Sequence, residues 1–128
     1  MIANLTQHPA SADQQQAGVI DLQGDALVRL KEALTFHECP SAEEVSERAR
    51  FVAHLVSGDS IVAKGLKAEK AMIGGALWLM GPLAAALRGH GVEPIFAFSV
   101  RVTEEIVQED GSTRKVAVFR HTGFVPAV

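Results

Sequence analysis

Cysteine is almost absent from this chain of 128 residues, and its scarcity excludes several classes of protein. The single cysteine, Cys39, cannot form an intramolecular disulfide, so the chain is not a disulfide scaffold. The paired cysteine spacing that a structural metal site requires is also missing. Cys39 lies in a predicted loop with no clear base beside it, which favours a plain thiol over a nucleophile. One unpaired cysteine fits a protein of the reducing cytoplasm.

An excess of positive charge is missing as well. The sequence has 12 lysines and arginines against 15 aspartates and glutamates, which gives a formal net charge of −3 and a pI of about 5.9. Binding to duplex nucleic acid depends on a basic surface, so we do not expect it here. A small anionic ligand in a local basic pocket remains compatible with this charge.

The sequence predicts neither a membrane span nor a signal peptide. The most apolar stretch, residues 71–87, is interrupted by glycines and a proline, and its 17 residues are short for a membrane helix. The N-terminus has no basic segment followed by an apolar one. With 48% hydrophobic residues and no repeat or linker, the chain is expected to form one globular domain over residues 1–128.

Three helices are predicted in the first half of the chain. Two of them begin with the pattern of a capping box, Ser11 with Gln14 and Ser41 with Glu44. Between these two, residues 24–34 place apolar side chains at helical spacing.

A fourth helix is predicted over residues 76–87, and it is apolar on nearly every side. Such a helix is usually covered on more than one side. We therefore expect it to pack both on the sheet and in the interface of a homodimer, with Trp78 and Met80 as anchors.

Extended segments alternate with these helices. They are residues 2–6, 70–73, 92–107 and 114–125, with 19–22 as either a short strand or an extended connection. Asp110 and Gly111 predict a tight hairpin between the last two. Strands separated by helices pair in parallel, whereas the hairpin strand is antiparallel. We therefore predict an α/β fold, a three-layer Rossmann-like sandwich whose mostly parallel sheet ends in a C-terminal antiparallel hairpin. The sequence gives no clear prediction for residues 59–69.

Candidate binding residues gather where the predicted parallel strands end. The first strand is followed by a polar loop with Thr6, Gln7 and His8, and a later one by Gly74 and Gly75. Open α/β sheets bind ligands at the carboxyl ends of their parallel strands, and glycines let a ligand approach the N–H groups of a helix start. The structural alternative is that Thr6 and His8 cap the first helix and tie down the terminus, and that the glycines form only a tight turn.

The long strand and its return strand add further candidates. Ser99 and Arg101 lie toward the exit of the long strand. A two-residue turn would place Arg101 opposite Arg120 and Ser99 opposite Thr122, with His121 on the other face. Two facing arginines repel unless an anion lies between them, so this pattern indicates a phosphate or carboxylate ligand. The alternatives are solvated edge charges for the arginines and a core or loop position for His121.

No dinucleotide-binding glycine motif, P-loop, nucleophile elbow or metal-ligand cluster occurs in the sequence. We therefore predict neither a cofactor nor a metal. The prediction of a site depends on several short sequence patterns that all place residues at one edge of the sheet.

The opening segment, residues 4–9 with 13–14 after it, resembles the first strand and loop of small CRISPR-associated Rossmann-fold (CARF-like) proteins. The glycine pair, the apolar helix after it and residues 97–99 fit the same layout. Some stand-alone members of that family are ring nucleases that act on cyclic oligoadenylates, while other CARF-like folds bind without cutting. The resemblance suggests a nucleotide ligand, and in particular a cyclic oligonucleotide.

The resemblance also implies a homodimer whose two sites face each other across a twofold axis. Cleavage in such a site uses a ribose 2′-hydroxyl as the nucleophile and needs no metal, with an arginine stabilising the phosphate charge and a histidine transferring protons. The expected ligand-binding residues are Thr6, Gln7, Gly74, Gly75, Ser99 and Arg120, and the expected catalytic residues are His8, Arg101 and His121.

The C-terminal segment, residues 119–125, has a Phe-Arg-His-x-Gly-Phe-Val pattern and is similar to a group of small uncharacterised bacterial and mobile-element proteins. Two functional hypotheses follow. The first is a nucleotide-binding domain, extending to a metal-independent ring nuclease. The second is a non-enzymatic homo-oligomeric interaction module, assembled through residues 76–87 and the hairpin.

Overall fold

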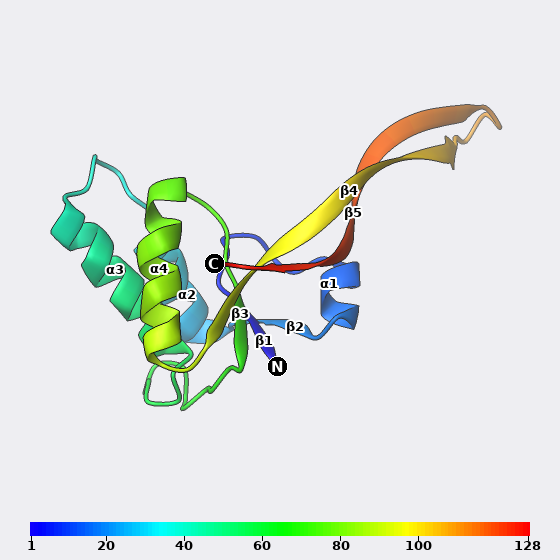
Figure 1. The fold of residues 1–128 in the computed structure, drawn as a ribbon. Coiled ribbons are helices and arrows are strands. Elements are labelled where there is room, and N and C mark those ends of the chain that lie inside the picture. Colours follow the sequence, from blue (N-terminus) through cyan, green and yellow to red (C-terminus); the bar gives the residue numbers. More distant parts are fainter.

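Five strands form a single sheet in the order β2-β1-β3-β4-β5 (Figure 1) in a computed structural model that describes all residues, 1–128. The strands are β1 (Ile2–Asn4), β2 (Val19–Asp21), β3 (Lys70–Met72), β4 (Glu93–Val107) and β5 (Thr113–Pro126). The first four run parallel, and β5 pairs antiparallel with β4. The prediction of a mostly parallel sheet that ends in an antiparallel hairpin is confirmed.

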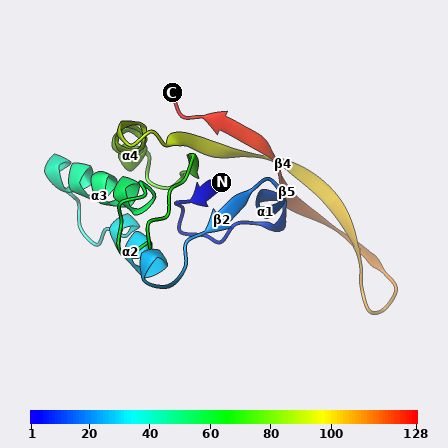
Figure 2. The same cartoon turned by 90° about the horizontal axis from the view of Figure 1, so that it is seen from below.

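Helices cover both faces of this sheet, as Figure 2 shows from below. They are α1 (Ala12–Gln16), α2 (Gly24–Leu34), α3 (Ala42–Leu55) and α4 (Leu77–Gly89). The three longer helices lie on one face, and the five-residue α1 lies on the other. The predicted three-layer arrangement is therefore present, with one thick helical layer and one thin layer.

The connections reverse direction between β1 and β3. The chain crosses from β1 to β2 through α1 on one face, then from β2 to β3 and from β3 to β4 through the longer helices on the other. This strand order is one of the common orders of doubly wound sheets, and the reversal opens a crevice outside the carboxyl ends of the two central strands. The fold therefore sets the place of a candidate site at the ends of β1 and β3.

The main hydrophobic core lies between the sheet and the thick helical layer. Fully buried members include Leu5, Leu30, Val52, Leu83 and Leu87. A smaller cluster lies on the thin side and consists of Ala10, Val19, Met72 and Ile95. Burial of both faces explains why the successive residues Ala71, Met72 and Ile73 at the central strand β3 are all apolar.

The predicted helix starts are largely confirmed. Ser11 and Gln14 form both hydrogen bonds of a capping box at α1. At α3 the Ser41 hydroxyl accepts from the backbone N–H of Glu44, as predicted. The carboxylate of Glu44 does not complete the box, because it pairs with Arg48 one turn later at 3.0 Å.

The predicted role of Met80 as an interface anchor is wrong. Met80 is 6% exposed and packs in the main core, so it cannot contact a partner. Trp78 is half exposed, and the Phe36 ring packs against it edge to face, with 4.9 Å between the centroids. No helix has both the length and the apolar character needed to cross a membrane.

The hairpin between β4 and β5 differs from the prediction in its register. Its connection spans residues 108–112, closed by a 2.7 Å hydrogen bond from the Gln108 N–H to the Ser112 carbonyl, so it is longer than a two-residue turn. Arg101 therefore lies opposite Phe119 and Arg120 opposite Val100, which places the two arginines on opposite faces. A register shift next to Phe98 restores the alignment of a two-residue turn closer to the sheet.

His121 is moved by the same shift. It lies opposite Ser99, so it shares a face with Ser99 and Arg101 instead of lying behind them. With this register Arg101 and Arg120 do not face each other, so their positions do not indicate an anion between them. Ser99 and Arg101 also lie in the middle of β4, which continues to Val107, and not at its exit.

Candidate functional site

A cavity of about 310 Å³ lies at the carboxyl edge of the sheet, where the crossover direction reverses. Thr6, Gln7 and His8 line it from the loop after β1, and residues 74–76 line it from the loop after β3. Leu34 and Leu79 complete its wall. The two loops predicted from the sequence to approach each other therefore do so.

The start of α4 supplies unpaired hydrogen-bond donors to this cavity. The backbone N–H groups of Gly74, Gly75 and Ala76 make no hydrogen bond within the chain, and Ala76, the N-cap residue, has no side chain that could cap the helix. Gly75 has a φ of 132°, which a side chain would strain. Successive free N–H groups before a helix carry partial positive charge and favour an anion.

Asn4 holds the opposite loop in shape, and the sequence analysis missed it. Its side chain is buried and forms four hydrogen bonds. The amide nitrogen donates to the His8 carbonyl at 2.7 Å and to Asp21 Oδ1 at 2.8 Å, and the amide oxygen accepts from the N–H and hydroxyl of Thr6. The sequence does contain a signal for this role, because Asn4 ends an otherwise apolar strand and a buried amide needs hydrogen-bond partners.

Two of the predicted site residues are partly engaged in this framework. The Thr6 hydroxyl donates to Asn4, and Gln7 Nε2 donates to the Leu34 carbonyl at the end of α2 at 2.9 Å. The imidazole of His8 is exposed. The alternative that Thr6 and His8 cap the first helix is wrong, because Ser11 caps it. Of the three side chains in this loop, His8 is therefore the one whose polar group makes no hydrogen bond within the chain.

The predicted residues of the hairpin do not line this cavity. Arg120 pairs with Asp13 of α1 at 3.0 Å and with Glu104 at 3.5 Å. His121 packs on the ring of Phe124 with 4.6 Å between the centroids, and its Nδ1 atom is buried without a hydrogen-bond partner. None of the four predicted hairpin residues, Ser99, Arg101, Arg120 and His121, lines the cavity of the same chain. Their predicted binding and catalytic roles therefore stay predictions.

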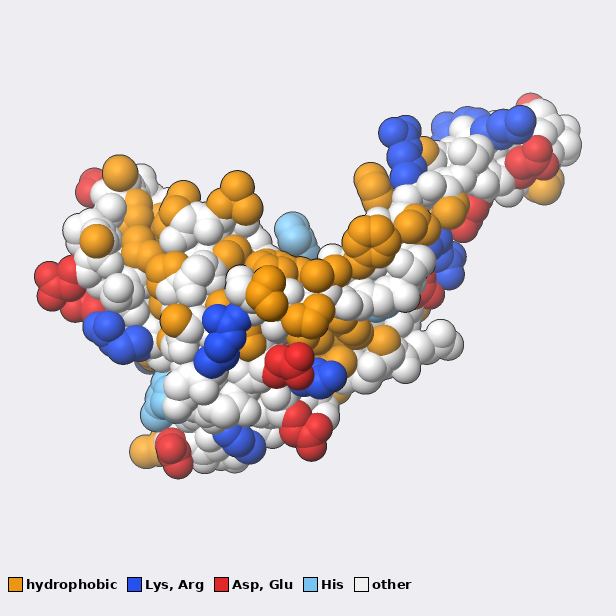
Figure 3. All heavy atoms as spheres, viewed as in Figure 1, with side chains coloured by type: hydrophobic (Ala, Val, Ile, Leu, Met, Phe, Trp, Pro, Cys, Tyr) orange, Lys and Arg blue, Asp and Glu red, His pale blue; other side chains and the backbone are white.

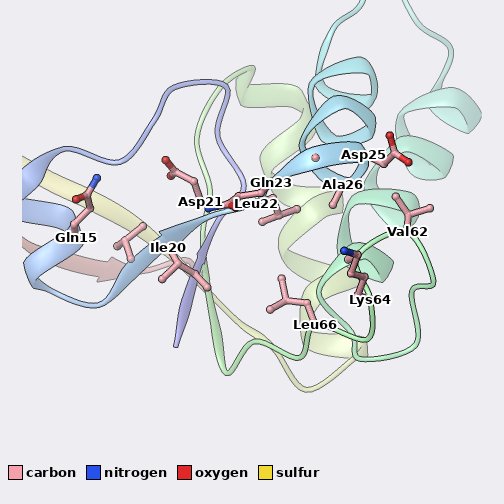
Figure 4. Close-up of a pocket in the computed structure, with 13 residues that line it drawn as sticks. Gln15, Ile20, Asp21, Leu22, Gln23, Asp25, Ala26, Val62, Lys64 and Leu66 are labelled. Atoms are coloured by element: carbon pink, nitrogen blue, oxygen red, sulfur yellow. The ribbon is translucent and has the colours of Figure 1, made fainter.

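A larger open groove follows the free edge of β2 (Figure 4). It has a volume of about 1020 Å³ and lies between β2 and the loop that carries Val62, Lys64 and Leu66. Two carboxylates, Asp21 and Asp25, line it together with one cation, Lys64. This lining carries a net negative charge and opposes an anionic ligand, whereas no aspartate or glutamate lines the smaller cavity.

The residues present do not offer a metal centre. No group of three histidine, cysteine, aspartate or glutamate side chains is arranged to hold an ion. The small cavity instead combines backbone donors, one amide, one hydroxyl and one imidazole. Such a set can bind and orient an anion through hydrogen bonds.

A family model described as Uncharacterized protein MJ1673 family matches residues 1–125. The chain belongs to this family. Comparison with curated proteins and with solved structures gives no match. The family match spans both loops of the small cavity and almost all of the hairpin, and its description assigns no activity.

Proposed function

We propose that the cavity between the β1 and β3 loops binds a small anionic ligand of the nucleotide class. The observation that carries this proposal is the run of free N–H groups at Gly74, Gly75 and Ala76, directly before α4. A phosphate placed there accepts hydrogen bonds from these groups and gains from the dipole of a 13-residue helix.

Size and charge support the same ligand class. A volume of about 310 Å³ is at the small end of ligand pockets, which start near ~300 Å³, and suits a single nucleotide unit. His8 stands at the wall of the cavity, and no carboxylate lines it. The small adjoining hollow that shares Thr6, Gln7 and His8 is lined by both Lys31 and Asp21, so the preference for an anion comes from the cavity itself.

A cyclic oligonucleotide is the more specific form of this proposal. Such a ring is larger than one cavity, so it requires two copies of the chain that each hold one part. In this scheme a ribose 2′-hydroxyl attacks the adjacent phosphorus, the bond to the 5′-oxygen breaks, and a 2′,3′-cyclic phosphate forms. His8 takes or supplies the proton, and the N–H groups stabilise the phosphate charge. The resemblance to CARF-like ring nucleases supports this step. We place the protein in the cytoplasm because its single cysteine is unpaired.

Thermal unfolding against mono-, di- and cyclic oligonucleotides tests the proposal. A ligand that binds only the native protein raises the midpoint, by the equivalent of about 2.7 kcal/mol at a hundredfold excess over its dissociation constant. We expect at least one nucleotide to do so. The shift should shrink in Gly74→Ala, whose new methyl group enters the cavity wall, and persist in Gly81→Ala, where the added methyl meets no atom within 4 Å.

His8→Ala and His37→Ala form a second matched pair. Both histidines are exposed, but only His8 lines the cavity. A ligand shift lost in the first variant and kept in the second supports the proposal. The absence of a shift with every nucleotide would contradict it and favour the interaction module.

A further inference from the structure

Two large apolar side chains are exposed at the start of α4, next to the small cavity. On the face shown in Figure 3, hydrophobic side chains gather over this helix and its neighbours. Leu77 and Trp78 are the first two residues of α4, and they are 88% and 49% exposed. Ala76 and Leu79, on either side of them in sequence, line the cavity. Large exposed apolar side chains beside a cavity are typical of a contact with a ligand or a partner.

Phe36 and Arg48 hold the Trp78 indole in place. The Phe36 ring meets the indole edge to face, with 4.9 Å between the centroids and 79° between the planes. The guanidinium carbon of Arg48 lies 4.4 Å from the centroid of the Phe36 ring, and the same guanidinium donates to the Thr35 carbonyl at 2.8 Å. Phe36 follows Leu34, a residue of the cavity wall, by two positions. The indole is therefore oriented before a ligand arrives, which lowers the entropy cost of contact with it.

The geometry of the helix directs the Trp78 side chain toward the free N–H groups of Gly74, Gly75 and Ala76. Side chains of an α-helix tilt toward its N-terminus. Trp78 comes two residues after the N-cap residue Ala76, which is a rise of about 3 Å along the axis. A phosphate held by the N–H groups therefore lies within about one helical turn of the indole. A nucleotide carries its base one ribose away from its phosphate, so the base can reach the indole from that position.

We propose that Trp78 stacks against the base of the nucleotide whose phosphate binds at the start of α4. This inference rests on the proposed function and adds to it a residue that selects a ligand with a base over a phosphate without one. Bases stack readily on aromatic side chains because every base has a π-face. Leu77 exposes further apolar surface beside the indole.

The sequence predicts a different role for Trp78, as an anchor of a homodimer. Met80, the other predicted anchor, lies in the main core and cannot contribute to an interface. An aromatic side chain covers about 150–250 Å² at most. Leu77 and Trp78 therefore supply much less than the ~800 Å² per partner of a standard interface, whereas one indole face is enough to cover one base.

Fluorescence titration of the unaltered chain tests the inference, because Trp78 is its only tryptophan. Adenosine monophosphate and ribose 5-phosphate share a ribose and a phosphate, but only the first carries a base. We expect adenosine monophosphate to quench the tryptophan fluorescence in a saturable way and ribose 5-phosphate to leave it unchanged. In calorimetric titrations adenosine monophosphate should bind at least ~10-fold more tightly, which corresponds to about 1.4 kcal/mol.

Three variants separate stacking from a structural role. Trp78→Ala should remove the difference in affinity between the two compounds and keep the affinity for ribose 5-phosphate. Trp78→Phe retains an aromatic ring and should restore most of the preference for adenosine monophosphate. Val28→Ala is the matched control, because Val28 is 53% exposed on α2 and does not line the cavity, and it should bind both compounds as the wild type does.

Failure of the inference differs from failure of the proposed function. Equal affinity of the wild-type chain for the two compounds, or an equal loss of both affinities in Trp78→Ala, overturns the stacking role and leaves the phosphate site in place. Binding of neither compound contradicts the proposed function, and the inference falls with it. A Trp78→Ala chain that binds adenosine monophosphate normally but loses a dimer seen by sedimentation velocity overturns the inference in favour of the interface role.

Discussion

Asn4 donates a hydrogen bond to Asp21 at 2.8 Å, and this contact joins the carboxyl ends of β1 and β2. Asp21 Oδ1 also accepts from the N–H of Ala10 at 3.0 Å, so the two side chains together hold the loop between β1 and α1. The loop presents Thr6 and His8 to the cavity. The shape of the candidate site therefore depends on the hydrogen-bonded pair Asn4 and Asp21, which supports the loop.

We expect Asn4→Ala to lower the free energy of unfolding by about 2–4 kcal/mol, because it removes four hydrogen bonds of a buried amide and leaves their partly buried partners unsatisfied. Urea denaturation measures the change. Gln16→Ala, an exposed substitution on α1, is the control and should stay within ~0.5 kcal/mol of wild type. Equal stability of the two variants would show that the network is not needed for folding.

The two glycines of the cavity should respond differently to alanine. Gly75→Ala should destabilise the protein by about 1–3 kcal/mol, because its φ of 132° strains any side chain. Gly74→Ala should leave stability nearly unchanged, since its new methyl group makes an ordinary 3.5 Å contact with Thr6 Cγ2. Thermal and urea unfolding of the two variants measure their stabilities. A greater loss of stability in Gly74→Ala than in Gly75→Ala would contradict the geometry of the loop.

Arg48 closes the end of α2 from the neighbouring helix. Its Nη1 donates to three carbonyl oxygens there, of which that of Thr35 is nearest at 2.8 Å. We expect Arg48→Ala to cost about 1.5–3 kcal/mol in unfolding free energy, as for hydrogen bonds to a charged group. Arg50→Ala, two residues along α3 and exposed, is the control and should be neutral. The idea fails if both variants unfold at the same urea concentration.

The hairpin tip predicts a local effect of pH. The hydroxyl and N–H of Ser112 donate to Asp110, and these hydrogen bonds lower the pKa of Asp110 from its ordinary value of 3.8. Because folding lowers this pKa, the stabilising contribution is present above pH 3.8 and disappears as pH falls through the folded value. An NMR titration should show the pKa of Asp110 rising in Ser112→Ala. An unchanged pKa would mean that the tip hydrogen bonds do not persist in solution.

Much of the fold follows from local patterns in the sequence. Capping at Ser11 and Ser41, and the apolar strand before Gly74, place elements that the structure contains at nearly the same bounds. The meeting of the β1 and β3 loops also follows, because neighbouring parallel strands have their carboxyl ends at one edge of the sheet.

The remaining features depend on contacts that no local pattern encodes. A connection of residues 108–112 in place of a two-residue turn, and a compensating shift near Phe98, decide which face Arg101 and Arg120 occupy. Arg120 then pairs with Asp13, which is 107 residues away in sequence. The burial of Met80 depends on which side of α4 meets the sheet, and an all-round apolar helix gives no periodic signal for that choice.

Amide NMR spectra recorded during titration with adenosine monophosphate and a cyclic oligoadenylate test the central claim most directly. We predict that the largest shifts occur at the N–H signals of Gly74, Gly75 and Ala76, with smaller changes at Thr6 and His8. Saturable shifts confined to this set would support the cavity as a nucleotide site. Shifts confined to the β2 groove, or none at millimolar ligand, would contradict the account.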